Sequence, residues 1–273
     1  MSLSSVIISF VAALLLAVGT AAFIIKKHPR RLIRGAVISA AVIAELALVA
    51  VLYVENYYKA DEIALSYLEG RSDTVAVSQT EDGYLFDGPG ASKALIFYPG
   101  GKVETEAYAP LMSKIAQRGI DCLLVDMPLR LAFTDMNAAD RLIARYGYSD
   151  WYIGGHSLGG VAAASYAAEN ADKLRGIVLL ASYSTEKLDD GLRCLTAVGS
   201  KDGVLNMAKY ERHAANLPRD AVKLVIDGGN HSGFGSYGFQ SGDGEADITP
   251  PEQWDITARA VGELIGREAM NNE

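Results

Sequence analysis

The sequence predicts an α/β protein in which a doubly wound, mostly parallel sheet follows a two-helix transmembrane hairpin. Two observations lead to this prediction. Two long apolar stretches lie near the N-terminus, and short apolar runs alternate with helical patterns over the rest of the chain. With 273 residues, the chain is long enough for one sizeable α/β domain and an additional element. We expect the hairpin in 1–54, a helical linker in 55–72 and the α/β domain in 73–273.

The two apolar stretches are residues 6–25, which carry no charge, and residues 35–54, whose single charge is Glu45. A helix of twenty residues is roughly 30 Å long, which is the thickness of the hydrocarbon core of a bilayer. Two buried core helices are the alternative, but such helices normally have a polar face and these stretches have none. A cleaved signal peptide is disfavoured because the first residues, MSLSS, lack a basic residue.

The segment that connects the two stretches is basic. The residues before the first stretch, 1–5, include no basic residue, and Lys59 is the only basic residue close after the second stretch. Cytoplasmic loops of membrane proteins carry an excess of Lys and Arg, so we expect the connector in the cytoplasm. The α/β domain then lies on the extracytoplasmic side of the cell membrane. The basic residues of the connector are Lys26, Lys27, Arg30, Arg31 and Arg34.

Glu45 lies near the middle of the second apolar stretch. An ionisable group there costs roughly 2.5–3.5 kcal/mol on insertion scales, which favours either a function or a neutralising partner. We favour a protonated carboxyl bonded to Ser9, to Thr20 or to a second copy of the chain. A functional role for Glu45 is the alternative.

Charge is distributed unevenly along the chain. The formal net charge is −8, and residues 1–54 hold five basic residues and one acidic residue. The remainder therefore holds 20 basic and 32 acidic residues, which is a formal charge of −12. An acidic domain of this kind is a poor partner for nucleic acid. We expect no nucleic-acid binding, and the sequence leaves the oligomeric state open.

After the second apolar stretch, residues 55–70 have a helical pattern that ends at Gly70. The runs TVAVSQ and YLFDG then flank Glu81-Asp82-Gly83, which predicts a β-hairpin. Six continuous apolar runs follow, as expected for parallel strands buried on both faces. These runs are ALIFYPGG, DCLLVDMP, WYIGGHS, RGIVLLASY, RCLTAVGS and AVKLVIDGG.

Helical patterns lie between most of these strands. The segments EAYAPLMSKIAQRG and VAAASYAAEN have helical spacing, and a capping box at Thr249-Pro-Pro-Glu252 opens a last helix that should reach about Glu268. Cys122 and Cys194 fall in two different strands that should lie several positions apart, beyond the reach of a disulfide. We expect both to be buried thiols, and neither has the spacing of a metal ligand.

One motif combines a reactive side chain with local backbone requirements. Gly155-His156-Ser157-Leu158-Gly159 matches the G-x-S-x-G pattern, and it stands between an apolar strand and an alanine-rich helix. A serine on such a strand–helix turn adopts a strained backbone conformation, so the residues two positions away cannot carry bulk. Gly155 and Gly159 meet this requirement. We interpret the motif as a nucleophile elbow with Ser157 as the nucleophile.

The base that would activate Ser157 must come from another part of the chain. Adjacent side chains diverge on such a turn, so His156 should pack near the site rather than act as the base. Of the other histidines, His28 lies in the membrane connector and His213 lies on a charged helix where we expect exposure. His231 lies on a glycine-rich loop directly after the last strand, which makes it the candidate base.

The third group should be a carboxylate on a loop after the preceding strand. CLTAVGSKDG supplies Asp202 there. Asp227 also follows a strand, but it lies only four residues from His231 and better fits a turn. Asp126 precedes the nucleophile in the sequence. We favour Asp202, with Asp227 as the alternative.

The order Ser157, Asp202, His231 is that of the α/β-hydrolase superfamily. The sequence resembles the serine hydrolase (esterase/lipase-like) branch of this superfamily over about Ala94–Gly266. The segments GHSLGG, GSKDG and GGNH carry the resemblance. It implies a catalytic triad in which His231, oriented by Asp202, takes the proton of Ser157 as the hydroxyl attacks a carbonyl carbon.

The resemblance also implies an oxyanion hole. One backbone N–H would come from Leu158 and a second from the loop after the first buried strand, at Gly101 or Lys102. This chain has Tyr98-Pro99 where many relatives begin with His-Gly, which leaves the second donor open.

The activity implied is hydrolysis of a carboxylic ester, thioester or amide without a metal or another cofactor. The expected partners are a small-molecule acyl substrate and the lipid bilayer. SYSTEKLDDGL is too short for the lid that many relatives carry, and residues 127–148 have room for a helix that lines a pocket. A short lipid-like or small hydrophobic ester fits the membrane tether. The alternatives are an acyltransferase that uses the same triad and a membrane-tethered binding domain without activity.

Overall fold

The computed structural model describes residues 16, 19, 20, 23, 31–69, 74–90 and 92–266. The chain divides into two compact units, and the division falls between Tyr57 and Tyr58. The N-terminal unit contains the helix α2 (Arg31–Glu55), and the C-terminal unit contains the sheet.

Helix α2 is 25 residues long and contains the second predicted span. Among the described residues, Gly35–Tyr53 is the one helical stretch that could cross a membrane by its length and composition, and none of it is buried. The first predicted span, 6–25, and His28 lie outside the described residues, apart from residues 16, 19, 20 and 23. The two-helix hairpin therefore stays a prediction.

The segment that follows α2 is only partly helical, although the sequence pattern favoured a helix up to Gly70. Helix α2 ends at Glu55, and Tyr58 then forms a parallel bridge with Val103. A separate short helix, α3 (Glu62–Leu68), follows. The helix is interrupted because the backbone of Tyr58 pairs with another part of the chain, and such pairing requires an extended conformation.

The C-terminal unit is built on a mixed eight-stranded sheet with the order β1-β2-β4-β3-β5-β6-β7-β8. The predicted hairpin is present as β1 and β2, which pair antiparallel, and β2 also pairs antiparallel with β4. All other neighbours pair parallel. The strands are β1 (Ala76–Thr80), β2 (Gly83–Asp87), β3 (Lys93–Tyr98), β4 (Asp121–Val125), β5 (Asp150–His156), β6 (Gly176–Leu180), β7 (Arg193–Gly199) and β8 (Val222–Ile226).

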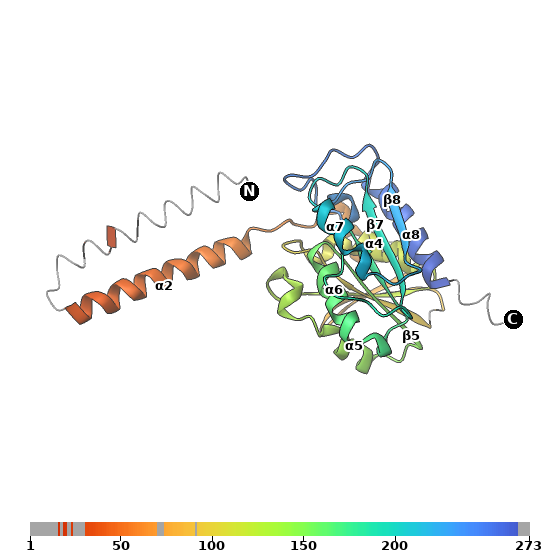
Figure 1. Ribbon diagram of the computed structural model, residues 1–273, viewed down its shortest axis with the longest axis horizontal. Coiled ribbons are helices and arrows are strands. Elements are labelled where there is room, and N and C mark those ends of the chain that lie inside the picture. The colour runs from red at the N-terminus through yellow and green to blue at the C-terminus, as the bar shows by residue number, and fades with distance from the viewer. Residues whose placement is uncertain are drawn as a thin grey trace. The chain divides into compact units, whose positions relative to one another are not determined.

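Helices cover both faces of this sheet (Figure 1). Alternate residues of the central strand β3 belong to different clusters of buried side chains: Leu95 and Phe97 pack with α4 and α8, whereas Ala94 and Ile96 pack with α5 and α6. This alternation confirms the continuous apolar runs as strands buried on both faces. The helices are α4 (Ala109–Ala116), α5 (Ala138–Arg145), α6 (Leu158–Glu169), α7 (Met207–His213) and α8 (Pro250–Gly266).

Short 3-10 helices complete the connections. The segment 127–148, which had room for a helix, contains two of them and α5. The 3-10 helices are η1 (Thr105–Tyr108), η2 (Pro128–Arg130), η3 (Ala132–Thr134), η4 (Ala171–Lys173), η5 (Ala214–Asn216) and η6 (Ser232–Phe234).

Two further predictions concern α8 and the cysteines. The capping box is formed, because Glu252 Oε2 accepts from the Thr249 backbone N–H at 2.7 Å and Thr249 Oγ1 accepts from the Glu252 N–H at 3.4 Å. Cys122 lies on β4 and Cys194 on β7, with three strands between them in the sheet, and both are buried free thiols.

Candidate active site

Ser157 lies on the turn between β5 and α6 with φ 51° and ψ −120°. A non-glycine residue in this region of backbone space is strained, and such strain is typical of functional turns. The neighbouring glycines are required by close packing. A Cβ on Gly155 would lie 2.6 Å from the carbonyl carbon of Gly159, and a Cβ on Gly159 would lie 2.1 Å from the Pro99 oxygen. The strand–turn–helix geometry inferred from the motif is therefore present.

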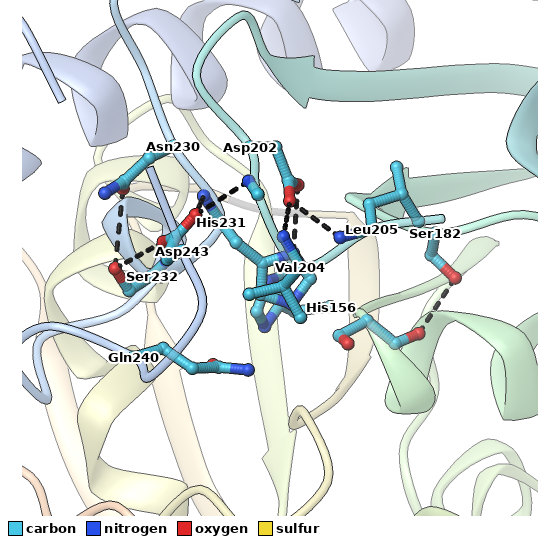
Figure 2. Close-up of polar contacts among 12 residues, drawn as sticks. His156, Ser182, Asp202, Val204, Leu205, Asn230, His231, Ser232, Gln240 and Asp243 are labelled. Carbon is cyan, nitrogen blue, oxygen red and sulfur yellow. Dashed lines mark hydrogen bonds and ion pairs between the residues drawn. The ribbon is translucent and has the colours of Figure 1, made fainter. Parts of the chain in front are cut away.

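His231 and Asp202 lie on loops that follow β8 and β7. The His231 Nδ1 atom is 2.9 Å from Asp202 Oδ2, and both side chains are almost completely buried. The second carboxylate oxygen accepts from the backbone N–H groups of Val204 at 2.9 Å and Leu205 at 2.8 Å (Figure 2). These bonds fix the carboxylate so that one oxygen faces the imidazole.

The alternative carboxylates make other contacts. Asp227 accepts from the Ser200 hydroxyl at 3.3 Å, and Asp126 accepts from the Thr105 hydroxyl at 2.8 Å. Asp202 is therefore the carboxylate that pairs with His231 in this structure.

The structure brings the loops of Ser157 and His231 together without a hydrogen bond between the two side chains. The ring of His156, which directly precedes Ser157, lies with its centroid 4.5 Å from that of His231. The His231 Nε2 atom is buried and has no hydrogen-bond partner in the part of the chain that the structure describes. In enzymes without bound substrate such a bond is often long, and it tightens when the substrate binds.

His156 is held by a contact with a buried tyrosine. Its Nδ1 atom is 2.7 Å from the Tyr108 hydroxyl, which accepts from the Gly100 N–H at 3.0 Å. Burial lowers the pKa of the His156 imidazole well below its ordinary value, and the adjacent His231 ring lowers the pKa further. His156 is thus a neutral ring that packs between the nucleophile turn and the loop after β3.

The remaining histidines are His28, which lies outside the described residues, and His213. His213 ends α7 and is half-buried, with its ring stacked on Tyr183 at a centroid distance of 4.9 Å. The sequence favoured an exposed His213. The stacking partner explains the difference, because the ring covers the face of another aromatic side chain.

Backbone donors gather next to Ser157. Leu158 opens α6, and N–H groups in the first turn of a helix have no acceptor within that helix. Gly101 packs against it, since a Cβ on Gly101 would lie 2.7 Å from Leu158 Cδ2. The Lys102 N–H instead donates to the Arg130 carbonyl at 2.9 Å. Of the two candidates for the second donor, Gly101 is therefore the one whose N–H is not committed to Arg130.

A second carboxylate, which sequence reasoning missed, joins the loops that carry Asp202 and His231. Asp243 Oδ1 accepts from the backbone N–H groups of Gly203 at 3.1 Å and of His231 at 3.2 Å. Its Oδ2 accepts from the N–H and the hydroxyl of Ser232, both at 2.8 Å (Figure 2). No motif marks Asp243, because its partners are backbone groups of loops that meet only in the folded chain.

Replacing Asp243 with asparagine should destabilise the protein in a pH-dependent way. Partial burial raises the pKa of this carboxyl, but hydrogen bonds from Ser232, Gly203 and His231 outweigh burial and hold the pKa below its ordinary value. A depressed pKa means that the carboxylate stabilises the fold fully above the ordinary pKa of about 3.9 and progressively less as pH falls towards the folded-state value. We expect Asp243→Asn to lower the free energy of unfolding by about 1–2 kcal/mol at pH 7. The amide NH₂ cannot accept the hydrogen bonds that one carboxylate oxygen accepts, and the remaining amide oxygen keeps the others.

Urea unfolding of wild type and Asp243→Asn between pH 7 and pH 3 measures this effect, and the difference should shrink below about pH 4. Asp247→Asn is the matched control, because that exposed carboxylate pairs with Lys201 at 2.9 Å on the surface. It should change stability by at most about 1 kcal/mol. A difference for Asp243→Asn that is the same at every pH would contradict the prediction.

The strands β5, β7 and β8 run parallel, so the loops that carry Ser157, Asp202 and His231 leave the same edge of the sheet. This arrangement is that of an α/β protein whose three candidate residues lie on loops at one edge of the sheet. The model of the Alpha/beta hydrolase family matches residues 94–255, which is more than half of the chain. The chain belongs to the alpha/beta hydrolase family.

Solved structures support the same fold. The monoacylglycerol lipase of Paleococcus ferrophilus is 16% identical, with a TM-score of 0.52 over 71% of this chain and 99% of that chain. Esterase 2 of Thermogutta terrifontis, solved after phosphoramylation by tabun, is 12% identical, with a TM-score of 0.51 over 75% and 99%. TT1662 from Thermus thermophilus is 16% identical, with a TM-score of 0.51 over 71% and 97%. No curated protein matches the sequence significantly.

Proposed function

We propose that the protein is a membrane-anchored serine hydrolase that cleaves carboxylic esters through an acyl-enzyme. The observation that carries the proposal is the buried His231–Asp202 pair, joined at 2.9 Å, at the same sheet edge as the strained Ser157 turn. A nucleophile, a base and a group that orients the base are the parts that this chemistry requires.

In the proposed reaction, His231 Nε2 takes the proton of the Ser157 hydroxyl as the oxygen attacks the ester carbonyl. Asp202 holds Nδ1 protonated, so that Nε2 is free to accept. The proton then passes to the leaving alcohol, and a water molecule activated by the same nitrogen releases the acid. The backbone N–H groups of Leu158 and Gly101 would stabilise the oxyanion, and the loss of one such donor costs about 3 kcal/mol of transition-state stabilisation.

The membrane anchor is part of the proposal. The described side chains of α2 between Gly35 and Tyr53 are unburied and, apart from Ser39 and Glu45, apolar. An apolar helix of this length is stable when a bilayer covers it. Together with the basic connector, this favours a catalytic domain on the extracytoplasmic side.

A fluorophosphonate probe tests the proposed nucleophile. The full chain in detergent should be labelled on Ser157, because an activated serine attacks the phosphorus centre and displaces fluoride. Ser157→Ala should take no label. Ser165→Ala is the matched control, since that hydroxyl lies on the same helix α6 and bonds to Glu186 at 3.0 Å, and it should label like wild type. A folded wild type that takes no label, while a known serine hydrolase in the same tube does, would refute the proposal.

A further inference from the structure

The chain that leaves α2 soon pairs with a loop of the proposed active site. Helix α2 ends at Glu55, and residues 56 and 57 alone separate it from Tyr58. The Tyr58 N–H donates to the Lys102 carbonyl at 2.8 Å, and the Tyr58 carbonyl accepts from the Glu104 N–H at 2.8 Å. Tyr58 is therefore paired with the loop that carries Gly101, the proposed oxyanion donor.

The same segment, 58–61, also holds the loop that follows His231. The Asp61 N–H donates to the Ser236 carbonyl at 3.0 Å, and the Ser236 hydroxyl donates to Asp61 Oδ1 at 2.7 Å. The Tyr58 hydroxyl accepts from the Ser241 N–H at 3.2 Å. Segment 58–61 is thus hydrogen-bonded on one side to the oxyanion loop and on the other side to the loop of the proposed base.

Covalent geometry limits how far these loops can lie from the end of α2. Each residue spans at most about 3.6 Å, so Tyr58 lies within roughly 11 Å of Glu55 for any arrangement of the two units. If α2 crosses a bilayer, its C-terminal end lies at the membrane surface, and so does segment 58–61. The loop that carries Gly101 and the loop that follows His231, which together we call the mouth of the proposed site, are then held near the lipid head groups by hydrogen bonds.

Exposed apolar side chains occur on segments that adjoin 58–61 either directly or through the loop of Lys102. Ile63 follows directly on α3, Phe239 lies on the loop after His231, and Leu129 lies in the 3-10 helix whose Arg130 carbonyl binds the Lys102 N–H; they are 53%, 58% and 57% exposed. Single exposed apolar residues are common on protein surfaces. Here they come from three segments next to the chain that leaves an apolar helix, and an interfacial location would cover them with lipid.

We infer that segment 58–61 fixes the mouth of the proposed active site at the membrane surface, where it takes acyl esters of amphiphiles that reside in the bilayer. The inference rests on the proposed function. It specifies a substrate class, namely esters whose carbonyl lies at the lipid–water interface. A water-soluble ester reaches the same serine from solution and needs no contact with the membrane.

Two butyrate esters test the inference with one common acyl-enzyme. The first is the butyrate of a water-soluble fluorogenic alcohol, and the second is the butyrate of a long-chain alcohol held in phosphatidylcholine vesicles. The full-length wild type, reconstituted in the same vesicles, should respond to surface dilution. Adding inert phosphatidylcholine that dilutes the amphiphile fivefold in the membrane, at constant bulk ester concentration, should lower its hydrolysis about fivefold and leave hydrolysis of the soluble ester unchanged.

An insertion separates the domain from the membrane. Four EAAAK repeats between Asn56 and Tyr57 add a semi-rigid spacer of roughly 30 Å and leave the pairing of Tyr58 intact. Hydrolysis of the vesicle ester should fall at least tenfold, and hydrolysis of the soluble ester should stay within twofold of wild type. A Gly/Ser insertion of equal length is the matched control, and its flexible chain should give a smaller loss on the vesicle ester.

The outcomes separate the two proposals. If wild type and Ser157→Ala hydrolyse both esters equally poorly, the proposed function fails. If wild type hydrolyses the soluble ester but the rate on the vesicle ester ignores surface dilution, the function stands and this inference is wrong. It is also wrong if the EAAAK insertion leaves hydrolysis of the vesicle ester unchanged, or if a folded insertion variant loses both activities in parallel.

Discussion

Ser157→Ala and His231→Ala should each lower kcat for a soluble ester by about 10⁶-fold, and the double variant should lose no more than either single variant. The expectation follows from one shared step. Without the hydroxyl there is nothing for the imidazole to deprotonate, and without the imidazole the hydroxyl stays protonated and weakly nucleophilic. The effects of two groups that act as a unit are therefore not additive.

Steady-state rates on the soluble butyrate ester measure these losses, and near-identical thermal unfolding curves would show that the variants remain folded. Asp202→Asn should cost less, about 10⁴-fold, because the proposed base and nucleophile remain while the tautomer of His231 is no longer imposed. Losses that multiply in the double variant would contradict a shared step, and they would indicate that the two residues act independently.

Local sequence patterns were sufficient for the parts of the site that depend on neighbouring residues. The turn at Ser157 could be predicted because its strain and its glycine contacts arise within the segment 155–159 and the strand beside it. The position of His231 after the last strand followed from the order of strands and helices. The fold class followed from the continuous apolar runs, and residues 94–255 match the alpha/beta hydrolase family.

Contacts between distant segments could not be predicted in this way. Tyr108 meets His156 across 48 positions of the sequence, and the hydroxyl of Tyr58 meets Ser241 across 183. Such contacts depend on the order of strands in the sheet, which apolar periodicity does not encode. The same limit explains why the sequence could not separate Gly101 from Lys102, since the carbonyl that binds Lys102 belongs to Arg130.

Gly159→Ala should have the largest effect on stability of the substitutions considered. The new Cβ would lie 2.1 Å from the Pro99 oxygen and 2.2 Å from the Tyr98 oxygen, well inside van der Waals contact. Both are backbone atoms at the end of β3, so relief requires a shift of the strand end and of the loop that carries Gly101. We expect a loss of about 4 kcal/mol or more, which corresponds to a melting temperature lower by roughly 8–16 °C.

The matched control is Gly147→Ala, because a Cβ there would meet nothing within 4 Å and the backbone needs no left-handed conformation. That variant should be as stable as wild type or slightly more stable, since alanine restricts the unfolded chain. Thermal unfolding of both variants in detergent measures the difference. If Gly159→Ala melts like Gly147→Ala, then the helix α6 and the loop after β3 are not packed as tightly as the structure requires, and the proposed oxyanion hole between them loses its physical basis.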